Sequence, residues 1–446
     1  MSFNTNYVVN LEDIKNMESA IFHRGPDDNG QYINKNRNIG LGFRRLSIID
    51  IKSGAQPMTS MNGDIHLVFN GEIYNHKSLR EILLNRGHTF NTLSDTESIL
   101  NGYVEWGFKV VNHLRGMFSF GIWDSKKNIL FIARDRLGIK PLYYYSKNGR
   151  FAFSSEIKSL LSLGYIKKEI NDESLFHYLT LAASPSPGTM FKNINKLEPG
   201  YTLIVKPNGD IQKKQYWCPS INRERVKHNE IEIIEKLRIL LKESVKMRMM
   251  SDVPYGAFLS GGIDSSLNTA LMSELSKDQV KTFTVSISDD PLSNELSEAK
   301  YVSKYFSTNH HEVSISKQDF IDFLPTLARQ QDEPLSDPVS IPLYYVSELA
   351  RRSNTPVILV GEGADEIFSG YKLYNMLSNF NNRIYKPFSN LPEIIKNISY
   401  SLAKFVLPER KLNYVENATL NRELFWGGSI VFSEKEKKRL LRNVAN

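Results

Sequence analysis

The sequence predicts an α/β protein overall, in which an N-terminal α+β domain precedes a doubly wound, parallel α/β domain. Between residues 39 and 153, short apolar runs separated by turn residues dominate, which is typical of short strands. From residue 257 to residue 360, strand-like and helix-like segments alternate, and this order indicates a parallel sheet with helices on both faces. The length of 446 residues also exceeds what one hydrophobic core usually fills, so two domains are expected.

In the first half we expect strands at residues 65–69, 118–123 and 129–133, where apolar residues form short runs bounded by turn residues. Two helices are expected near residues 77–85 and 96–106, because apolar residues recur there at spacings of three and four. Strands that outnumber the helices indicate the α+β class for this half.

Proline and glycine accumulate at residues 184–188 and 197–200, and a hairpin-like run with Asn208-Gly209 at its turn follows. This composition predicts the join between the domains. We expect a first domain at residues 1–200, a linker at 201–229 and a second domain at 230–446.

In the second half, a long helical pattern at residues 231–250 leads into the alternating units. These units are strand 257–259, helix 265–275, strand 282–287, helix 295–306 and strand 357–360. Ligands of such a sheet bind at the carboxyl ends of its strands. The functional loops of this half are therefore expected directly after the strands.

The composition excludes several classes of protein. Hydrophobic residues make up 41% and charged residues 24%, as in globular proteins, and no window holds the roughly 18 uninterrupted apolar residues of a membrane span. The first residues have neither a basic nor an apolar signal region, and a single cysteine excludes an internal disulfide. Because the chain has one cysteine and no signal region, we expect a cytoplasmic protein, and because it has no apolar span we expect no membrane partner. The net charge of +7 indicates a solvated surface, so we expect no nucleic-acid partner.

The most informative segment runs from Tyr255 to Ser266, from an apolar strand through paired glycines into a hydroxyl-rich helix start. Paired glycines let the backbone approach an anion closely, while the N–H groups and positive dipole end of the helix face the negative charge. Asp264 offers an oxygen ligand for a magnesium ion that is coordinated by the phosphates. The lysine of the G-x-x-x-x-G-K-[ST] loop is absent. The segment therefore fits an adenylating site that holds pyrophosphate.

A second candidate runs from Val360 to Tyr371 and concentrates Glu362, Asp365 and Glu366 within five residues. Like charges at this spacing raise each other's pKa unless a cation intervenes, so the segment is either solvated or built around a ligand. The structural alternative is an acidic helix N-terminus. The flanking glycines favour a ligand, because they allow close approach of the backbone.

Four motifs stand in the first half, and each alone has an ordinary structural explanation such as a turn or a solvated arginine pair. They are His23-Arg24-Gly25-Pro26-Asp27, Arg44-Arg45-Leu46-Ser47-Ile48-Ile49-Asp50, Phe69-Asn70-Gly71-Glu72-Ile73-Tyr74-Asn75 and Ser94-Asp95-Thr96-Glu97.

Together with the glycine loop, its flank Ser251-Asp252-Val253-Pro254 and the acidic segment, these motifs resemble the asparagine synthetase family of glutamine-dependent amidotransferases. The resemblance implies an Ntn-hydrolase-like glutaminase domain, which is an α+β sandwich of antiparallel sheets between helices, and an ATP-pyrophosphatase domain that uses ATP and Mg²⁺. It implies that Glu362 is the catalytic base and that Asp264 and Asp365 are magnesium ligands. The residues that would border ATP and pyrophosphate are Leu259, Ser260, Gly261, Gly262, Asp264, Ser265, Ser266, Val285, Val360 and Gly361.

In the first domain, the resemblance implies that Arg45 grips the carboxylate of glutamine, that Asp95 and Glu72 hold its amino group, and that Asn70 with Gly71 forms the oxyanion hole. The glutamine site implied in this way comprises Arg45, Leu46, Ser47, Ile48, Ile49, Asn70, Gly71, Glu72 and Asp95. The segment Asp332-Glu333-Pro334-Leu335-Ser336-Asp337 also resembles a family segment that faces the active site, without an assignable role.

The sequence departs from the family pattern at both ends. The N-terminal Cys-Gly-Ile-x-Gly strand is absent, residue 2 is Ser2, and the one cysteine, Cys218, stands in the expected linker. The C-terminal segment of the family that bears a lysine is absent before Asn446. We therefore expect a chain shortened at both ends, in which ammonia serves as nitrogen donor and glutamine does not.

The expected reaction is amide formation from a carboxylate through an acyl-AMP, with aspartate converted to asparagine as the default. Three alternatives stay open at this point: amidation of a sugar uronic acid in surface polysaccharide assembly, a non-catalytic remnant that keeps nucleotide affinity, and a β-lactam-forming relative. The expected partners are small molecules, namely aspartate or another carboxylate with ammonia or glutamine. The oligomeric state is open, and a homodimer is considered.

Overall fold

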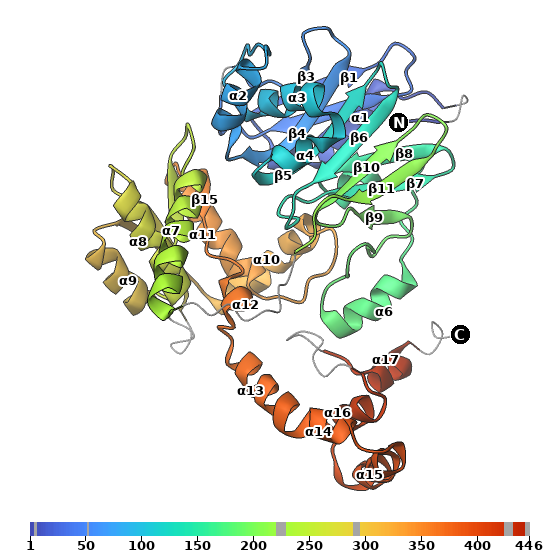
Figure 1. Cartoon of the computed structure of the whole chain (residues 1–446), viewed down its shortest axis with the longest axis vertical. Helices are drawn as coiled ribbons and strands as arrows, with labels where there is room; N and C mark the ends of the chain where they lie inside the picture. The colour runs from blue at the N-terminus through green and yellow to red at the C-terminus, as the bar shows by residue number, and fades with distance from the viewer. Residues whose placement is uncertain (4–6, 51–52, 220–228, 289–294, 423–430, 442–446) are drawn as a thin grey trace. The chain divides into compact units, whose positions relative to one another are not determined.

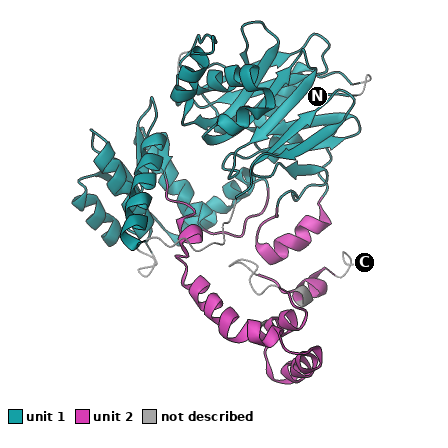
Figure 2. Cartoon of the chain, in the orientation of Figure 1, with its two compact units in different colours: residues 1–169, 186–332, 339–359 teal, residues 170–185, 333–338, 360–446 magenta. Residues whose placement is uncertain are grey.

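The computed structural model describes residues 1–3, 7–50, 53–219, 229–288, 295–422 and 431–441. The chain forms two compact units, coloured separately in Figure 2. The first comprises residues 1–169, 186–332 and 339–359, and the second comprises residues 170–185, 333–338 and 360–446.

The centre of the first unit is a six-stranded antiparallel sheet in the order β11-β10-β6-β5-β4-β3 (Figure 1). Its strands are β3 (Met58–Thr59), β4 (Ile65–Ile73), β5 (Gly116–Asp124), β6 (Ile129–Arg134), β10 (Tyr201–Val205) and β11 (Ile211–Gln215). The three strands expected from the sequence are confirmed as β4, β5 and β6. Strands β10 and β11, which lie in the expected linker, belong to this sheet, because β10 pairs with β6 and β11 pairs with β10.

Two smaller antiparallel sheets accompany it. One joins β1 (Asp28–Ile33) to β2 (Gly40–Arg45), and the other has the order β8 (Arg150–Ser154), β7 (Tyr143–Lys147), β9 (Ile194–Lys196). The helices of this part are α1 (Leu11–Ala20), η1 (Phe22–Arg24), α2 (His76–Leu84), α3 (Asp95–Trp106), η2 (Gly107–Lys109), α4 (Val110–His113) and α5 (Ile157–Leu161). The expected helices near residues 77–85 and 96–106 are thereby confirmed as α2 and α3.

Both faces of the six-stranded sheet are buried, because side chains alternate between two cores along each strand. Leu67, Phe69 and Phe131 pack in one core with residues of α2, α3 and α4. Val68 and Ile132 pack in the other core with Leu41 of β2 and Phe151 of β8, among other residues. The predicted sandwich of antiparallel sheets between helices is thereby confirmed.

A second sheet of the first unit is parallel and has the order β14-β13-β12-β15. Its strands are β12 (Tyr255–Phe258), β13 (Lys281–Ile287), β14 (Asn309–Ile315) and β15 (Val357–Leu359). The helices around it are α7 (Glu230–Arg248), α8 (Ile263–Leu275), α9 (Leu296–Tyr305), α10 (Lys317–Gln330) and α11 (Ser340–Arg352). The predicted doubly wound α/β domain is confirmed, since connections leave β12 toward β13 on one side and return to β15 on the other.

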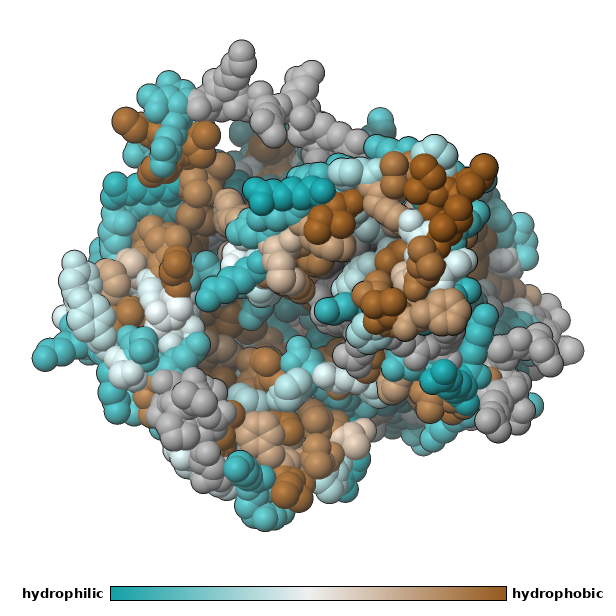
Figure 3. Space-filling view, turned by 90° about the horizontal axis from the view of Figure 1, so that it is seen from below, coloured by the Kyte–Doolittle hydropathy of each residue, from teal (hydrophilic) through white to brown (hydrophobic). Residues whose placement is uncertain are grey.

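The second unit consists of helices joined by loops. They are α6 (Asp172–Leu181), α12 (Ala364–Phe368), α13 (Lys372–Phe380), the π-helical η4 (Asn381–Tyr385), α14 (Lys386–Ser389), α15 (Glu393–Val406), α16 (Glu409–Thr419) and α17 (Glu434–Leu440). The Lys437 ammonium of α17 lies 3.5 Å from the ring centroid of Phe176 of α6, and the lysine is buried. Apolar side chains such as Phe405 of α15 are exposed, and apolar surface is visible in Figure 3.

Among the described residues, no helix is both long enough and apolar enough to cross a membrane.

The aromatic core next to α3 generates a stability prediction. Phe131 is fully buried, and its ring centroid lies 5.1 Å from that of Phe108 and 5.9 Å from those of Tyr103 and Phe120. Phe131→Ala is expected to lower the free energy of unfolding by about 3–5 kcal/mol, because a cavity replaces a fully packed ring. Urea denaturation followed by tryptophan fluorescence measures the change. Phe405→Ala, at a side chain that is 89% exposed, is the control, and an equal loss in both variants would contradict the packing argument.

Candidate functional sites

The glycine loop follows β12 as expected. Leu259 is buried and its N–H donates to the Phe283 carbonyl of β13 at 2.9 Å. Gly261 has a φ of +85°, and a Cβ there would lie 2.4 Å from the Cβ of Glu298. Both the conformation and the space therefore require glycine at position 261.

Hydroxyl groups hold this loop in shape. The Ser260 and Ser265 hydroxyl oxygens lie 2.9 Å apart, and the Gly262 N–H donates to Ser260 Oγ at 3.2 Å. The side chain of Ser266 is partly buried, and its Oγ has no hydrogen-bond partner within the described part of the chain. A polar atom left unpaired in this way is suited to meet a ligand.

The loop ends at the start of α8, a helix of 13 residues whose N-cap residue Gly262 provides no side-chain cap. The first N–H groups of the helix are consequently directed out of its end, where an anion would be stabilised. Asp264 stands half-buried in the first turn. Val285 of the neighbouring β13 is also half-buried. These positions fit a phosphate cradle with a carboxylate at its rim.

The acidic segment lies in the second unit, where Glu362 is exposed and Asp365 stands half-buried in the first turn of α12. Val360 and Gly361 are exposed. A Cβ on Gly370 would lie 1.9 Å from Asp365 Oδ1. This glycine therefore leaves space for the carboxylate that the resemblance assigns to magnesium.

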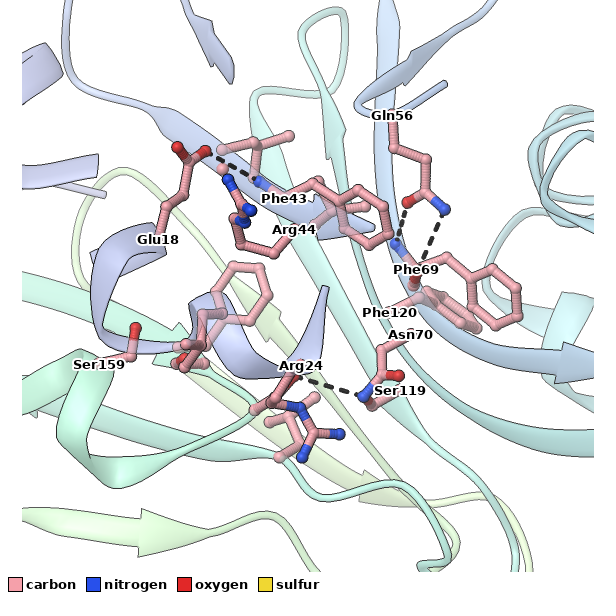
Figure 4. Close-up of a pocket in the computed structure, with 18 of the residues that line it drawn as sticks. Glu18, Arg24, Phe43, Arg44, Gln56, Phe69, Asn70, Ser119, Phe120 and Ser159 are labelled. Carbon is pink, nitrogen blue, oxygen red and sulfur yellow. Dashed lines mark hydrogen bonds between the residues drawn. The ribbon is translucent and has the colours of Figure 1, made fainter. Parts of the chain in front are cut away.

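A cavity of about 490 Å³ lies in the first unit, lined mainly by its antiparallel part and also by residues 356–358 at the start of β15 (Figure 4). It brings together eight of the nine residues expected at the glutamine site: Arg45, Leu46, Ile48, Ile49, Asn70, Gly71, Glu72 and Asp95. Ser47 is not among the lining residues, because its backbone N–H donates to Asp27 Oδ2 at 2.8 Å and holds this residue toward the preceding loop. The cavity has the residues to hold a small amino acid.

Arg45 at the end of β2 is buried and held in one orientation. Its Nη2 donates to the carbonyl oxygens of Asp50 at 2.6 Å and Ile49 at 3.3 Å. A buried, oriented guanidinium is suited to bind a carboxylate bidentately.

Asn70 and Gly71 stand in the middle of β4 opposite β5, where Asn70 faces Ser119 (Figure 4). Asn70 Nδ2 lies 3.4 Å from Ser155 Oγ. Gly71 has a φ of +151°, and a Cβ there would lie 2.0 Å from the Met117 carbonyl oxygen. Only glycine lets the two strands approach in this way.

Two buried carboxylates line the cavity beside these residues. Burial raises the pKa of Glu72 to about 7, a rise that Lys140 opposes and Asp95 adds to. Burial raises the pKa of Asp95 to about 6, although the Ile73 N–H donates to it at 2.9 Å. Perturbed carboxylates in a cavity are typical of a binding or catalytic site, and a ligand ammonium group would lower both pKa values.

The structure adds residues that the motifs did not indicate. The side-chain amide of Gln56 binds the backbone of Phe69 in β4. Its Oε1 accepts from the Phe69 N–H at 2.7 Å, and its Nε2 donates to the Phe69 carbonyl at 3.2 Å, as the dashed lines in Figure 4 show. Lys140 lines the cavity and partly offsets the charge of Glu72. Neither belongs to a recognisable motif, and only the folded chain brings them to the site.

Few of the described residues could supply a thiol or bind a metal ion without a ligand. Cys218 is exposed after β11, and no cysteine is among the described residues that line the cavity. Within the ranges the structure covers, no three His, Cys, Asp or Glu side chains are clustered to hold a metal ion by themselves. Asp264 and Asp365 thus remain predicted magnesium ligands that would act together with phosphate oxygens.

The titration of Glu72 generates a second prediction. Its pKa is about 7 in the folded chain against an ordinary value of 4.5, so the folded state binds the proton more tightly. Wild-type stability therefore contains a contribution that is present below pH 4.5 and lost as the pH rises toward 7. Glu72→Gln is expected to stabilise the chain at pH 8 by up to about 3 kcal/mol, but not at pH 4. Urea denaturation at both pH values measures this, with Glu12→Gln on the exposed side of α1 as control. A pH-independent effect would contradict it.

Comparison with known proteins places these features in a family. Residues 2–217 match the glutamine amidotransferase domain, and residues 236–436 match the asparagine synthase domain. Asparagine synthetase (glutamine-hydrolyzing) 1 of Bacillus subtilis (strain 168) is 38% identical over 435 residues, which cover 97% of this chain and 67% of that protein.

Two further relatives differ in name and coverage. Putative asparagine synthetase (glutamine-hydrolyzing) 2 of Methanocaldococcus jannaschii is 38% identical over 439 residues, covering 93% of this chain and 81% of that protein. Amidase chyE of Penicillium rubens is 32% identical over 385 residues, covering 82% of this chain and 56% of that protein. The two matching domains and the extent of these similarities show that the chain belongs to the asparagine synthetase (glutamine-hydrolysing) family.

Proposed function

We propose that the protein is an ATP-dependent amide-forming ligase, which converts a carboxylate and ATP into an acyl-AMP and pyrophosphate, and then the acyl-AMP and ammonia into an amide and AMP. The observation that carries this proposal is the loop Ser260–Gly262 between β12 and α8. Its glycines, hydroxyl groups and open helix start suit a bound phosphate chain. The lysine that reaches a terminal phosphate in other nucleotide loops has no counterpart in it.

In this proposal the chain's residues bind and orient ATP so that the α-phosphorus meets the carboxylate. The first N–H groups of α8 with Ser260 and Ser265 would hold the pyrophosphate portion, and the unpaired Ser266 hydroxyl would donate to it. Leu259 and Val285 would border the nucleotide. Mg²⁺, held by Asp264 and Asp365 with phosphate oxygens, would neutralise charge on the leaving pyrophosphate.

Glu362 is the proposed base for the second step, in which it would accept a proton as ammonia attacks the acyl-AMP. The connectivity of the sheet supports this assignment. Ala257 of β12 pairs with Leu359 of β15 in parallel, so both strands end at the same edge of the sheet. The chain then continues directly from Leu359 through Val360 and Gly361 to Glu362.

The cavity in the antiparallel part is the proposed glutamine site. Arg45 would bind the α-carboxylate, Glu72 and Asp95 the α-amino group, and Asn70 with Gly71 the amide oxygen. Since no cysteine lines this cavity among the described residues, ammonia is the proposed nitrogen donor for the polypeptide of this sequence.

Aspartate is the proposed acceptor, because two relatives that are 38% identical to this chain are named an asparagine synthetase and a putative asparagine synthetase. A sugar uronic acid is the second candidate acceptor, and a relative named an amidase is consistent with variation of the acceptor within the family.

Isotope exchange separates the two proposed steps. The full chain is expected to exchange labelled pyrophosphate into ATP in the presence of Mg²⁺ and aspartate. Asp264→Ala should lower the rate about a hundredfold or more, because a ligand of the Mg²⁺ that would neutralise the leaving pyrophosphate is lost. Glu362→Ala should retain exchange and lose asparagine formation, since Glu362 acts after adenylation.

Three outcomes of this assay contradict parts of the proposal. Exchange with a uronic acid but not with aspartate would transfer the proposal to the second acceptor. No exchange with any carboxylate would indicate a non-catalytic protein that keeps only nucleotide affinity. Loss of exchange in Glu362→Ala would place Glu362 in the first step.

The nitrogen donor is tested with ammonium chloride and with glutamine at pH 8. Amide formation is expected with ammonium and is expected to fall below detection with glutamine, while calorimetry still detects glutamine binding that Arg45→Ala abolishes. Glutamate release at a rate equal to amide formation would overturn the assignment of ammonia as donor.

A further inference from the structure

The segment Ser251–Pro254, which has no role in the proposed chemistry, contacts the loop that follows β2. The Asp50 N–H donates to Asp252 Oδ2 at 2.9 Å, and the Asp252 N–H donates to the Ile48 carbonyl at 3.2 Å. The contact joins the antiparallel and parallel parts of the first unit, whose residues are about 200 positions apart in the chain. These two bonds hold the loop's backbone on both sides of residue Ile49.

The peptide unit between Ile49 and Asp50 lies between two opposite charges. Its carbonyl oxygen accepts from Arg45 Nη2 at 3.3 Å, and its N–H donates to the Asp252 carboxylate. A cation at one end of an amide and an anion at the other polarise the amide in the same sense, so each bond strengthens the other. The next carbonyl, that of Asp50, accepts from the same Nη2 at 2.6 Å. Asp252 therefore acts on Arg45 through one shared peptide unit.

Asp50 also has a backbone conformation that needs support. Its φ of +49° lies in the left-handed region, which costs free energy for a residue other than glycine. Its side chain accepts from the Ser53 hydroxyl at 2.6 Å and from the Leu93 N–H at 2.9 Å. The bond from the Asp50 N–H to Asp252 completes this support, so its loss would loosen the turn that holds Arg45.

On the other side, Asp252 is joined to the nucleotide loop through strand β12. Ser251 Oγ donates to the Val253 carbonyl at 2.9 Å and accepts from the Val253 N–H at 3.2 Å, which shapes the turn before Pro254. Strand β12 then starts at Tyr255, and the glycine loop follows its other end. Asp252 and the loop Ser260–Gly262 therefore lie at opposite ends of one strand of four residues, which connects them.

We propose that Asp252 is a positioning residue that orients Arg45 and couples the nucleotide loop to the glutamine site. The proposal rests on the proposed roles of Arg45 and of the loop Ser260–Gly262. When a nucleotide orders the loop and β12, Asp252 holds the peptide unit of Ile49 and Asp50, and Arg45 binds the ligand carboxylate more tightly. The coupling is reciprocal, so glutamine tightens the binding of nucleotide by the same factor.

The test uses the full chain with Asp252→Ala, Asp252→Asn and the control Glu243→Ala. Asparagine keeps an oxygen that accepts the Asp50 N–H, whereas alanine does not. Glu243 of α7 pairs with Arg115 at 2.6 Å, which is another contact between the same two parts, and it has no bond to the loop of Arg45. The control therefore separates a specific effect on Arg45 from general loosening.

The first measurement is hydrogen exchange of the peptide that covers residues 46–54, with and without ATP and Mg²⁺. In the wild type and in Asp252→Asn we expect protection that increases with nucleotide. In Asp252→Ala we expect faster exchange and no response to nucleotide, while Glu243→Ala behaves as the wild type. Equal protection in wild type and Asp252→Ala without nucleotide would overturn the positioning role, whether or not the loop binds ATP.

The second measurement is the Kd of glutamine by calorimetry, with and without ATP and Mg²⁺. Because Asp252 is exposed, its hydrogen bond competes with water, and we expect Asp252→Ala to weaken glutamine binding by only about three- to tenfold and to remove the effect of nucleotide. Unchanged Kd values in Asp252→Ala, or an equal loss in Glu243→Ala, would overturn the coupling. A wild type that binds no glutamine would instead contradict the proposed function, and the exchange experiment would then decide the positioning role alone.

Discussion

The arrangement of the first unit depends on the burial of both faces of its six-stranded antiparallel sheet. On β4, Val68, Asn70 and Glu72 point to one face, because side chains alternate along a strand, and Leu67 and Phe69 point to the other. A shift of one residue in the pairing of β4 with β5 would move Asn70 and Glu72 into the aromatic core beside α3. The hydrophobic pattern that stabilises the sheet therefore also determines which polar side chains reach the cavity.

The charged side chains that line this cavity lower the free energy of unfolding of the chain. Glu72 and Asp95 are buried with raised pKa values, so their ionised forms cost free energy in the absence of a cation. Lys140 offsets part of this cost at Glu72. Arg45 on the facing β2 is bonded to backbone carbonyls, which orient it, and its charge interacts with the Asp50 carboxylate, whose pKa it helps to lower. Opposite charges kept on separate elements suit a zwitterionic ligand such as an amino acid, whose two charged groups would satisfy both sides.

The sequence predicts the elements that have strong local signals. The apolar runs of β4, β5 and β6 and the glycine pair before α8 were identified from residue types alone, because period-two burial and a tight turn both leave local patterns. Strand β14 was not expected. Its sequence Asn-His-His-Glu-Val-Ser-Ile is polar, since it lies at the edge of the parallel sheet.

Contacts that depend on the folded chain could not be predicted in this way. Residues 201–215 were expected in a linker because proline and glycine accumulate just before them, yet β10 pairs with β6 and β11 pairs with β10. Nothing local relates Asp252 to Asp50, since the bond between them is a consequence of how the antiparallel and parallel parts meet. The same holds for Ser47, whose side of the loop is set by a bond to Asp27. The order of the parallel sheet, by contrast, relates two distant stretches of the sequence. Because β12 pairs with β15 in parallel, the glycine loop and Val360 each follow a strand that ends at the same edge of the sheet, although about a hundred residues separate them in the sequence.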